Sequence, residues 1–477
     1  MAYIANVDTT EGGLVGKSLH LAWPAVLQAL LVNFYAFNDY LFVGMLGDAA
    51  ATAALSACFA VLIINYCLLA IFPTGAMSLI ARTFGARRID RAAAIIRQGL
   101  SATLLWSLVV SVLGLVMLPQ LIAAANVTPQ VGVKIGEYLR VIYWTTPSFA
   151  LMLVVVGAFR GCGNTRVPLI LECFSLVINV ALNYTLVIGW GPFESMGITG
   201  AAIATAVSRA VPGVIGLVLI WRGALGFSLV EEGTTWRQSW RPRFDALRAM
   251  ARIGVFECLA GMMYGFVYLV LNRMAGELGP AAQGGLGAGL RGIEWIGFAF
   301  GDGFFAASVA IVGQNVGARQ LERAYKGAWI AAGLSAVSCQ LVGFAFILFP
   351  YELCSLVTDD PLTLEYAATY VRIIGWAMGA VGLEMSMFGA MIGVGHTEVA
   401  FAISGGSNLL RVPLAAALLF GPAATLHGSA WALFGSGVAP PITGAFSALA
   451  ITIGVTAMLK ALLFIVYMVV RRDRFAS

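Results

Sequence analysis

The sequence predicts an all-α integral membrane protein, with twelve transmembrane helices arranged as two homologous six-helix lobes around a central cavity. Three observations support this fold: few charged residues, a series of apolar segments long enough to span a bilayer, and an internal duplication. Charged residues make up 11% of the 477-residue chain and hydrophobic residues 60%. Soluble domains are about 25% charged, so the composition is typical of a polytopic membrane protein.

Twelve apolar segments can be drawn along the chain, each close to or above the length of about 20 residues that a membrane-spanning helix needs. They cover 19–44, 51–80, 93–118, 135–158, 167–190, 197–221, 250–276, 284–313, 326–350, 367–392, 399–421 and 445–470. The start of the last segment is the least defined, because 422–444 is rich in Gly and Pro but still apolar. Residues 1–17 are interpreted either as a disordered leader or as an interfacial helix.

The positive charges predict the orientation in the membrane. Arg and Lys gather in alternate connections and in the tail, whereas the opposite connections carry Lys134 and several acidic residues. The basic positions are Arg82, Arg87, Arg88, Arg91, Arg160, Arg166, Arg222, Arg237, Arg241, Arg243, Arg248, Arg319, Arg323, Lys326, Arg471, Arg472 and Arg474. The positive-inside rule places these connections and both termini in the cytoplasm, with the protein in the cell (inner) membrane. A missed or extra helix would break the alternation.

The chain also repeats itself at a constant spacing. Four motifs return 232 residues later: MLGDAA (45–50) as ELGPAA (277–282), FGARRIDRA (84–92) as VGARQLERA (316–324), YLRVIYW (138–144) as YVRIIGW (370–376), and GAFRGCGNTRV (157–167) as GAMIGVGHTEV (389–399). Four matches in register indicate duplication. Because six helices is an even number, the two halves should be parallel repeats about an axis along the membrane normal. We expect an N-lobe over 1–221, a cytoplasmic linker over 222–249 and a C-lobe over 250–477.

Several classes of function find no support in the residues. The segment EGGLVGKS (11–18) resembles a phosphate-binding loop, but the first required glycine is Glu11. The seven cysteines lie mostly in apolar runs without a CxxC motif, and the three histidines are scattered. We therefore expect no enzyme, no organic cofactor and no nucleic-acid partner.

Five motifs in order and spacing resemble the MATE (multidrug and toxic compound extrusion) family. They are AWPAVLQ, NDYLFVGMLGD, GAFRGCGNTRVP, MGITGAAIATAVS and GLGAGLRGIEW followed by VGQNVGARQLERA. Arg291, Glu294 and VGQNVGA look most like the DinF-like bacterial branch. The resemblance implies a secondary active multidrug efflux transporter that exports cationic or amphipathic organic compounds in antiport with H⁺ or Na⁺ by alternating access. We expect a monomer surrounded by membrane lipid.

The alternative function is a lipid-linked oligosaccharide or lipid flippase of the same superfamily. Cavities of that kind tend to be strongly cationic, because they hold a pyrophosphate group. In this chain the acids inside the apolar segments roughly balance the arginines, which argues against a flippase. A channel would not require an isolated, asymmetric carboxylate site.

Asp39 is the leading candidate for cation coupling. A carboxylate at a helix centre costs on the order of 3 kcal/mol, and intramembrane acids are functional by default. Asn179 and Asn183 share a helix face at i,i+4 spacing, and Asn183 and Asp39 should lie at similar depth. Thr205 is the fourth candidate oxygen. The acid could take up a proton, because burial favours the neutral carboxyl, or the four groups could form an oxygen cage for Na⁺.

The resemblance adds weight to this site, because family members with an acid at position 39 use it in coupling. At position 183, however, this chain differs from the DinF-like pattern. DinF-like archaeal relatives have an aspartate where this chain has Asn183, whereas the NorM-like branch has asparagine. The second lobe does not repeat the site: at the 232-residue spacing its residues are Leu271, Arg411 and Ala415. A structural anchor remains the alternative for Asp39, and helix packing for the asparagines.

The C-lobe contributes a second group of candidates. Arg291 and Glu294, spaced i,i+3, either neutralise each other or take part directly in transport. Arg411 should have an acidic partner, with Glu294 and Asp302 as the candidates. The remaining candidates for a substrate cavity are Tyr35, Met263 and Tyr264, since soft and aromatic side chains re-pack around varied ligands. Ordinary core packing is the alternative for them.

Overall fold

The computed structural model describes residues 6–125, 127–229, 240–420 and 441–472, and these contain helices and connections but no strand. Arg237, Arg474 and part of the Gly/Pro-rich segment before the last helix lie outside the described residues, as does 230–239 of the expected linker. The all-α fold class is confirmed. Eleven described helices are long and apolar enough to cross a membrane, and a bent helix pair supplies a twelfth span.

In its described residues, the first lobe contains seven α-helices and one π-helical segment. Its helices are α1 (Leu14–Met45), α2 (Ala49–Gly85), α3 (Ile89–Val116), α4 (Leu118–Ala124), α5 (Pro129–Gly161), α6 (Arg166–Leu182) with its π-helical continuation η1 (Asn183–Gly189), and α7 (Gly197–Trp221). α4 is too short to span a bilayer, so six spans remain.

The second lobe has the same order of spans. Its helices are α9 (Phe244–Glu277), α10 (Pro280–Gly287), η2 (Ala288–Glu294), α11 (Trp295–Gly317), α12 (Leu321–Leu348), α13 (Pro350–Cys354), α14 (Pro361–Gly375), α15 (Met378–Val394), α16 (Thr397–Phe420) and α18 (Pro441–Val470). The eighth span is α10, the π-helical η2 and α11 in sequence.

The expectation of one continuous tenth helix over 367–392 is wrong. α14 and α15 meet at an angle of 61°. The break frees backbone groups, which must find partners inside a membrane. The side chain of Gln340 from α12 supplies both: its Nε2 donates to the carbonyl of Gly375 (3.0 Å), and its Oε1 accepts from the amide of Gly379 (2.9 Å).

The backbone repeats the duplication that the sequence predicted. Six of the twelve described residues with positive φ form pairs 232 positions apart: Gly47 and Gly279, Arg87 and Arg319, Gly163 and Gly395. For Arg87 and Arg319 this left-handed conformation is uncommon, because only glycine adopts it without steric cost. The turns that follow α2 and α11 therefore share the same strained conformation at an arginine.

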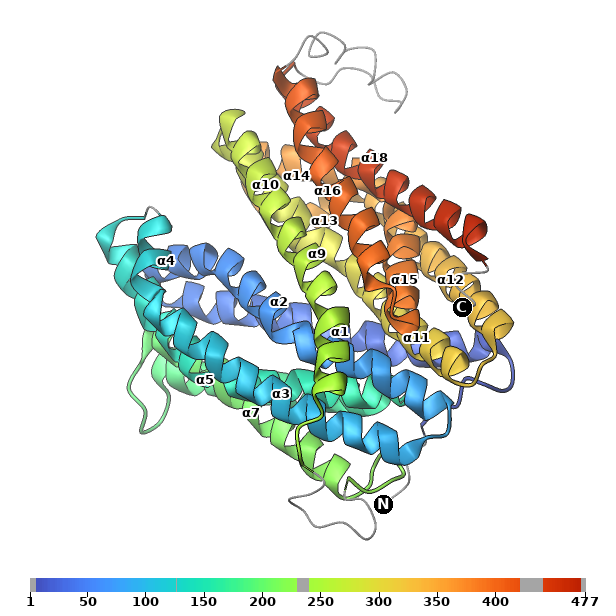
Figure 1. The fold of residues 1–477 in the computed structure, drawn as a ribbon. Coiled ribbons are helices and arrows are strands. Elements are labelled where there is room, and N and C mark those ends of the chain that lie inside the picture. The colour runs from blue at the N-terminus through green and yellow to red at the C-terminus, as the bar shows by residue number, and fades with distance from the viewer. Residues whose placement is uncertain (1–5, 126, 230–239, 421–440, 473–477) are drawn as a thin grey trace.

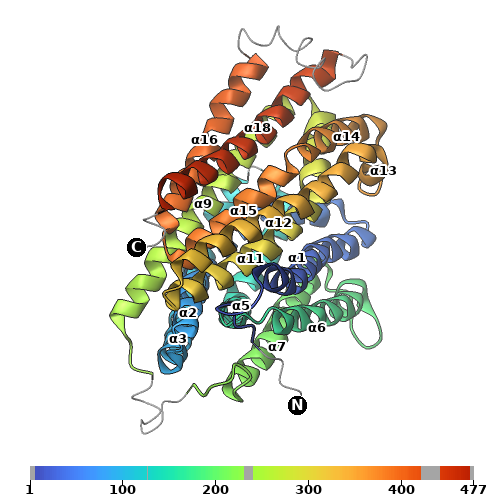
Figure 2. The same ribbon diagram turned by 90° about the vertical axis from the view of Figure 1, so that its right-hand side faces the viewer.

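The two lobes form a V (Figure 1), with α4 and α10 on separate arms. The arms meet through α1 against α11 and α2 against α9, and Figure 2 shows α1 lying between α11 and α6. Glycines permit the close approach: a Cβ at Gly254 would lie 1.8 Å from the carbonyl oxygen of Ile71, and one at Gly303 would lie 2.8 Å from that of Ala22. These two contacts are equivalent under the 232-residue repeat.

Residues 6–13 form an N-terminal strap at the end where the lobes meet, which we call the closed end. The strap precedes α1 and is not helical, so the interfacial-helix interpretation is wrong for these residues. On the N-lobe side, the side chain of Asn6 donates to the carbonyl of Leu225 (2.7 Å), and the amide of Val7 donates to the carbonyl of Gly163 (3.0 Å).

The same strap also binds the C-lobe. The amide and the hydroxyl of Thr9 both donate to Oε1 of Gln314 (2.8 Å each). The carbonyl of Thr9 accepts from Asn315 (3.2 Å) and from Arg323 (3.1 Å). Thr9 is buried, so the strap is an ordered bridge between the two lobes and not a disordered leader.

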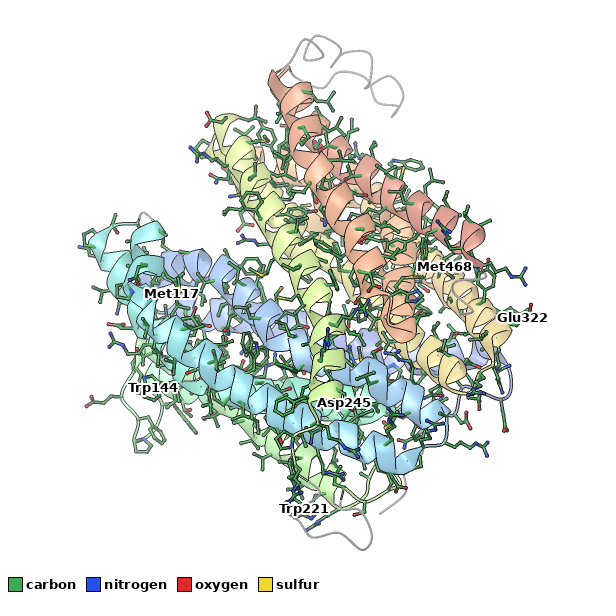
Figure 3. All side chains as sticks on the ribbon, in the orientation of Figure 1. Met117, Trp144, Trp221, Asp245, Glu322 and Met468 are labelled. Carbon is green, nitrogen blue, oxygen red and sulfur yellow. The ribbon has the colours of Figure 1, made fainter. Side chains whose placement is uncertain are left out.

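Large apolar side chains cover the outside of the bundle. Met117 and Trp144 lie on the surface of the N-lobe (Figure 3) and are exposed, as is Trp221. Glu322 and Asp245, also labelled there, belong to the first turns of α12 and α9. An apolar exterior of this extent is the surface that lipid covers in a multi-pass membrane protein.

Candidate functional site

The four predicted N-lobe side chains meet around the carboxyl group of Asp39. Nδ2 of Asn183 and Nδ2 of Asn179 donate to Asp39 Oδ1, at 2.7 and 3.1 Å. The hydroxyl of Thr205 donates to Oδ2 at 2.6 Å. Asp39 is only 5% exposed, so these three donors replace the water that the carboxylate loses on burial.

The local helix geometry explains how residues from three helices converge. Asn179 lies in the last turn of α6, and Asn183 opens the π-helical η1. A π-helical turn is wider than an α-helical one and is frequent at functional sites. Asn38, next to the acid on α1, donates to Oδ1 of Asn179 (2.7 Å) and orients that amide toward Asp39.

The donor pattern leaves one unsatisfied acceptor at the site. Oδ1 of Asn183 is buried and has no hydrogen-bond partner among the described residues. Rotation of an asparagine amide exchanges its oxygen for its nitrogen. With oxygens turned inward, Asp39, Asn179, Asn183 and Thr205 have the ligand chemistry that Na⁺ accepts. With nitrogens turned inward, as here, the same groups hold a carboxylate that can bind or release a proton.

A buried ion pair lies behind the Asp39 site. Nη1 of Arg209 is 2.5 Å from Oε1 of Glu172, and both side chains are buried. The guanidinium also lies over the ring of Tyr35, 4.1 Å from its centroid. The hydroxyl of Tyr35 donates to the carbonyl of Thr205 (3.1 Å) and shares a hydrogen bond with Ser208.

The sequence reasoning missed Glu172 and Arg209. Both are ionisable residues inside apolar segments, which is the same signal that singled out Asp39, and they could have been identified by it.

The Asp39 site opens into a cavity of about 250 Å³ in the N-lobe. Tyr35, Asp39, Thr205 and Arg209 form part of its polar wall, and aromatic residues such as Phe59, Tyr66 and Tyr138 also line it. Asn179 and Asn183 stand behind the carboxylate and are not among the lining residues.

A second cavity, of about 230 Å³, lies mainly in the C-lobe, and Tyr66, Cys67 and Ala70 of α2 complete its wall from the N-lobe. It is lined by the predicted residues Tyr264, Glu294 and Arg411, and by charged residues that sequence reasoning did not select: Glu257, Glu384 and Lys460. The Nζ of Lys460 is 3.2 Å from Oε1 of Glu384. Lys460 carries the same signal as Asp39, a charge inside a long apolar run.

Arg291, Asp302 and Met263 are not among the lining residues of either cavity. Met263 packs toward Gly405 of α16. Asp302 forms an ion pair with Arg160 of the N-lobe at 3.3 Å. This pair joins the two lobes, because Arg160 lies on α5 and Asp302 on α11.

The expected ion pair between Arg291 and Glu294 is not present in the part of the chain that the structure describes. The guanidinium of Arg291 lies over the ring of Phe59 at 4.1 Å, and Glu294 accepts a hydrogen bond from the hydroxyl of Tyr370 (2.5 Å). Both residues belong to η2, where a π-helical turn separates side chains that an α-helical turn would bring together.

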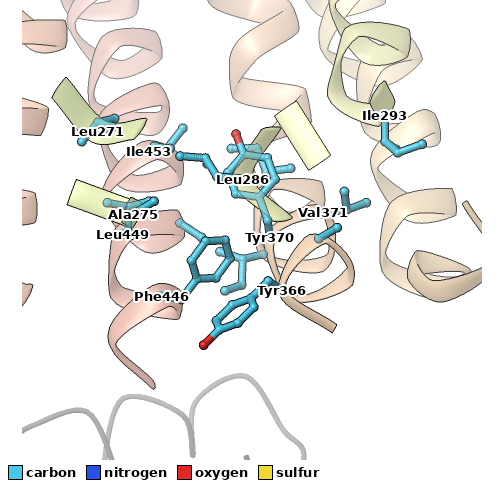
Figure 4. Packing of buried hydrophobic residues seen from close by; sticks show 14 of the residues in the cluster. Leu271, Ala275, Leu286, Ile293, Tyr366, Tyr370, Val371, Phe446, Leu449 and Ile453 are labelled. Atoms are coloured by element: carbon cyan, nitrogen blue, oxygen red, sulfur yellow. The ribbon is translucent and has the colours of Figure 1, made fainter. Parts of the chain in front are cut away.

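The expectation that Arg411 pairs directly with Glu294 or Asp302 is also wrong. Its Nε donates to the hydroxyl of Thr456 (2.7 Å), and its Nη1 donates to that of Tyr268 (3.1 Å). Figure 4 shows Tyr370 within the apolar C-lobe cluster, near Leu286. From that cluster the Tyr370 hydroxyl reaches Glu294.

Known proteins that resemble this chain include members of one transporter family. The MatE family model matches residues 24–185 and 258–417, which is more than half of the chain. A protein of Thermotoga maritima named "Probable multidrug resistance protein NorM" is 28% identical over 57% of each chain. The "FAD transporter" of Shewanella oneidensis is 24% identical over 83% of this chain and 86% of its own length. A solved MOP superfamily transporter from Pyrococcus furiosus has the same fold, with a TM-score of 0.84 at 19% identity, covering 100% of this chain and 99% of the other.

Proposed function

The chain belongs to the MatE family of membrane transporters, and on that premise we propose that it exports cationic or amphipathic organic compounds in antiport with H⁺ or Na⁺. The observation that carries the proposal is the buried carboxyl of Asp39, which faces a cavity and is held by three donors from other helices. A relative named as a multidrug resistance protein supports the substrate class.

The proposed cycle is alternating access between the two lobes. Basic residues from both lobes contact the strap at the closed end: Arg87 pairs with Glu11 at 3.3 Å, and Arg323 donates to the carbonyl of Gly12 at 2.6 Å. We place this end in the cytoplasm by the positive-inside rule. We place both termini there too, in the cell (inner) membrane, with a linker over 222–249 between lobes 1–221 and 250–477. The conformation described is then open to the outside.

Cation binding at Asp39 would change the hydrogen bonds that Asn179, Asn183 and Thr205 make. In the proposed cycle, this change favours the state that releases the organic compound outward. Linkage requires that cation and compound favour different states, or that they compete. At 100 mV, each charge that moves inward contributes about 2.3 kcal/mol, enough for a concentration ratio of roughly fiftyfold at one charge per molecule.

The test is gradient-driven ethidium efflux from proteoliposomes that contain wild type or Asp39→Asn. A pH gradient and a Na⁺ gradient are imposed separately. Asp48→Asn is the matched control, because Asp48 caps α2 by accepting from the amides of Ala50 and Ala51. Asparagine is as good an N-cap as aspartate, so this variant makes the same chemical change outside the cavity.

We expect one gradient to drive wild type and Asp48→Asn but not Asp39→Asn, and that gradient identifies the coupling ion. If Asp39→Asn keeps gradient-driven efflux, Asp39 is a structural anchor, and Glu294 and Asp302 become the candidates. If wild type moves no organic cation under either gradient, the antiport proposal fails and transport of a lipid-linked substrate is the reading to test next.

A further inference from the structure

The two lobes carry groups of opposite charge at related positions. Asn179, which holds Asp39 in the N-lobe, corresponds to Arg411 in the C-lobe under the 232-residue repeat. The counterpart of Asp39 itself is Leu271. Duplication has therefore left a carboxylate site in one lobe and a guanidinium in the other, and each faces its own cavity.

The guanidinium of Arg411 is buried without a carboxylate in direct contact. Arg411 is 3% exposed. Its two hydrogen bonds, to the hydroxyls of Thr456 and Tyr268, involve neutral groups. The ring of Tyr268 adds a cation–π contact, with Cζ of the arginine 5.5 Å from its centroid. Nη2 makes no hydrogen bond within the described part of the chain, which leaves one edge of the guanidinium fork available.

The carboxylates that face the same cavity form no ion pair with Arg411 among the described residues. Glu384 is bound by Lys460 (3.2 Å) and by the hydroxyl of Ser404 (2.9 Å). Glu294 accepts from Tyr370, and Oε2 of Glu257 is buried without a hydrogen-bond partner among the described residues. A buried cation without a carboxylate in direct contact is costly, so an anionic group of a ligand that contacts Arg411 would stabilise the guanidinium.

The rest of the cavity wall selects the shape of the ligand. Tyr264, Phe298, Phe305 and Phe388 provide aromatic surface, and Met385 adds a polarizable side chain. Aromatic and methionine surfaces accept flat apolar groups of varied shape. An anionic group directed at the arginine would leave the aromatic body of the same molecule against these residues.

We propose that the C-lobe cavity is a substrate subsite for the anionic group of an amphipathic aromatic compound, with Arg411 as the residue that binds it. Guanidinium groups bind carboxylates and phosphates through two parallel hydrogen bonds. The inference rests on the proposed export function and narrows its substrate class: zwitterions and aromatic acids are included, with their cationic part free to lie toward Asp39.

Two dyes that differ in one ester test the proposal. Rhodamine 110 carries a free carboxylate, and rhodamine 123 is its methyl ester. Binding of each is measured by fluorescence anisotropy to the full-length protein in nanodiscs. The variant is Arg411→Met. The matched control is Arg273→Met, which removes an exposed arginine of the same lobe that lines neither cavity.

We expect Arg411→Met to weaken rhodamine 110 binding by about tenfold or more, as for a lost charge-assisted hydrogen bond. Binding of rhodamine 123 should stay within about threefold of wild type by the same scale, and Arg273→Met should affect neither dye. Equal loss for both dyes would mean that Arg411 only builds the lobe. No loss for either dye would also overturn the proposal.

A wild-type measurement keeps the proposal falsifiable if Arg411→Met does not fold. Excess 1-naphthoate should displace rhodamine 110, whereas its methyl ester should not, and equal displacement by both overturns the subsite. The ethidium assay separates the two levels of inference. If ethidium is exported but the dye tests fail, only the anion-subsite proposal is refuted. If ethidium is not exported, the export function is refuted.

Discussion

Substitution of Gly85 by alanine should force the two lobes apart at the closed end. Gly85 on α2 contacts α11 so closely that a Cβ would lie 2.0 Å from the carbonyl oxygen of Gln314. The repeat-equivalent glycine, Gly317 on α11, has the mirrored contact, 1.9 Å from the carbonyl oxygen of Arg82. The obstacle is backbone in both cases, so no rotamer change can relieve it.

The geometry sets the size of the effect. An ordinary Cβ contact needs at least 3.4 Å, so the distance from position 85 to the Gln314 oxygen must grow from 2.0 Å to that value. Overpacking of this kind costs about 1–3 kcal/mol, which corresponds to a shift of roughly 5- to 150-fold away from the state in which this end is closed. Gly317→Ala should shift the equilibrium in the same direction.

Distances between spin labels at Arg88 and Gln320 report the opening directly, because these exposed positions are repeat-equivalent and stand beside the contact on either lobe. We expect a longer distance to gain population in Gly85→Ala and in Gly317→Ala. Gly333→Ala is the control, since nothing lies within 4 Å of a Cβ there. A wild-type distance distribution in both variants would refute the reasoning.

Two further predictions follow from contacts around the lobes. Glu172→Gln leaves the buried Arg209 without its counter-ion and should cost about 3–5 kcal/mol, seen as earlier thermal unfolding in detergent. The double variant Glu172→Gln/Arg209→Met should recover most of that loss, and a double variant as unstable as the single one would contradict the pairing. Gln314→Ala removes the acceptor of both Thr9 hydrogen bonds and should loosen the strap by about 1–3 kcal/mol. Hydrogen exchange over residues 7–12 should then quicken, and unchanged exchange would mean that other contacts hold the strap.

Much of the N-lobe site was predictable because its signals are local. An ionisable residue in an apolar run is visible at Asp39, and i,i+4 spacing puts Asn179 and Asn183 on one face whatever surrounds them. Depth along each span follows from length alone, because every residue advances a helix by the same rise. The four side chains accordingly lie together in the structure.

The C-lobe could not be predicted in the same way. Arg291 and Glu294 were expected to meet because α-helical spacing was assumed, and the π-helical turn of η2 separates them. Arg411 has neutral partners, Thr456 and Tyr268, that ordinary sequence reasoning does not seek for a cation. Partner choice across helices depends on how each helix is rotated, and spacing within one helix carries no information about that.

The sequence by itself determined that this chain spans a membrane as two duplicated lobes, and it located the carboxylate that one lobe buries. Hydrophobicity, charge and repeat spacing are enough to determine these features, because each depends only on the order of residues along the chain. Only the tertiary structure decided how the lobes meet through Gly85 and Gly317, how the strap bridges them, and which charges remain without a counter-ion. These features depend on distances between residues far apart in sequence, which packing alone sets.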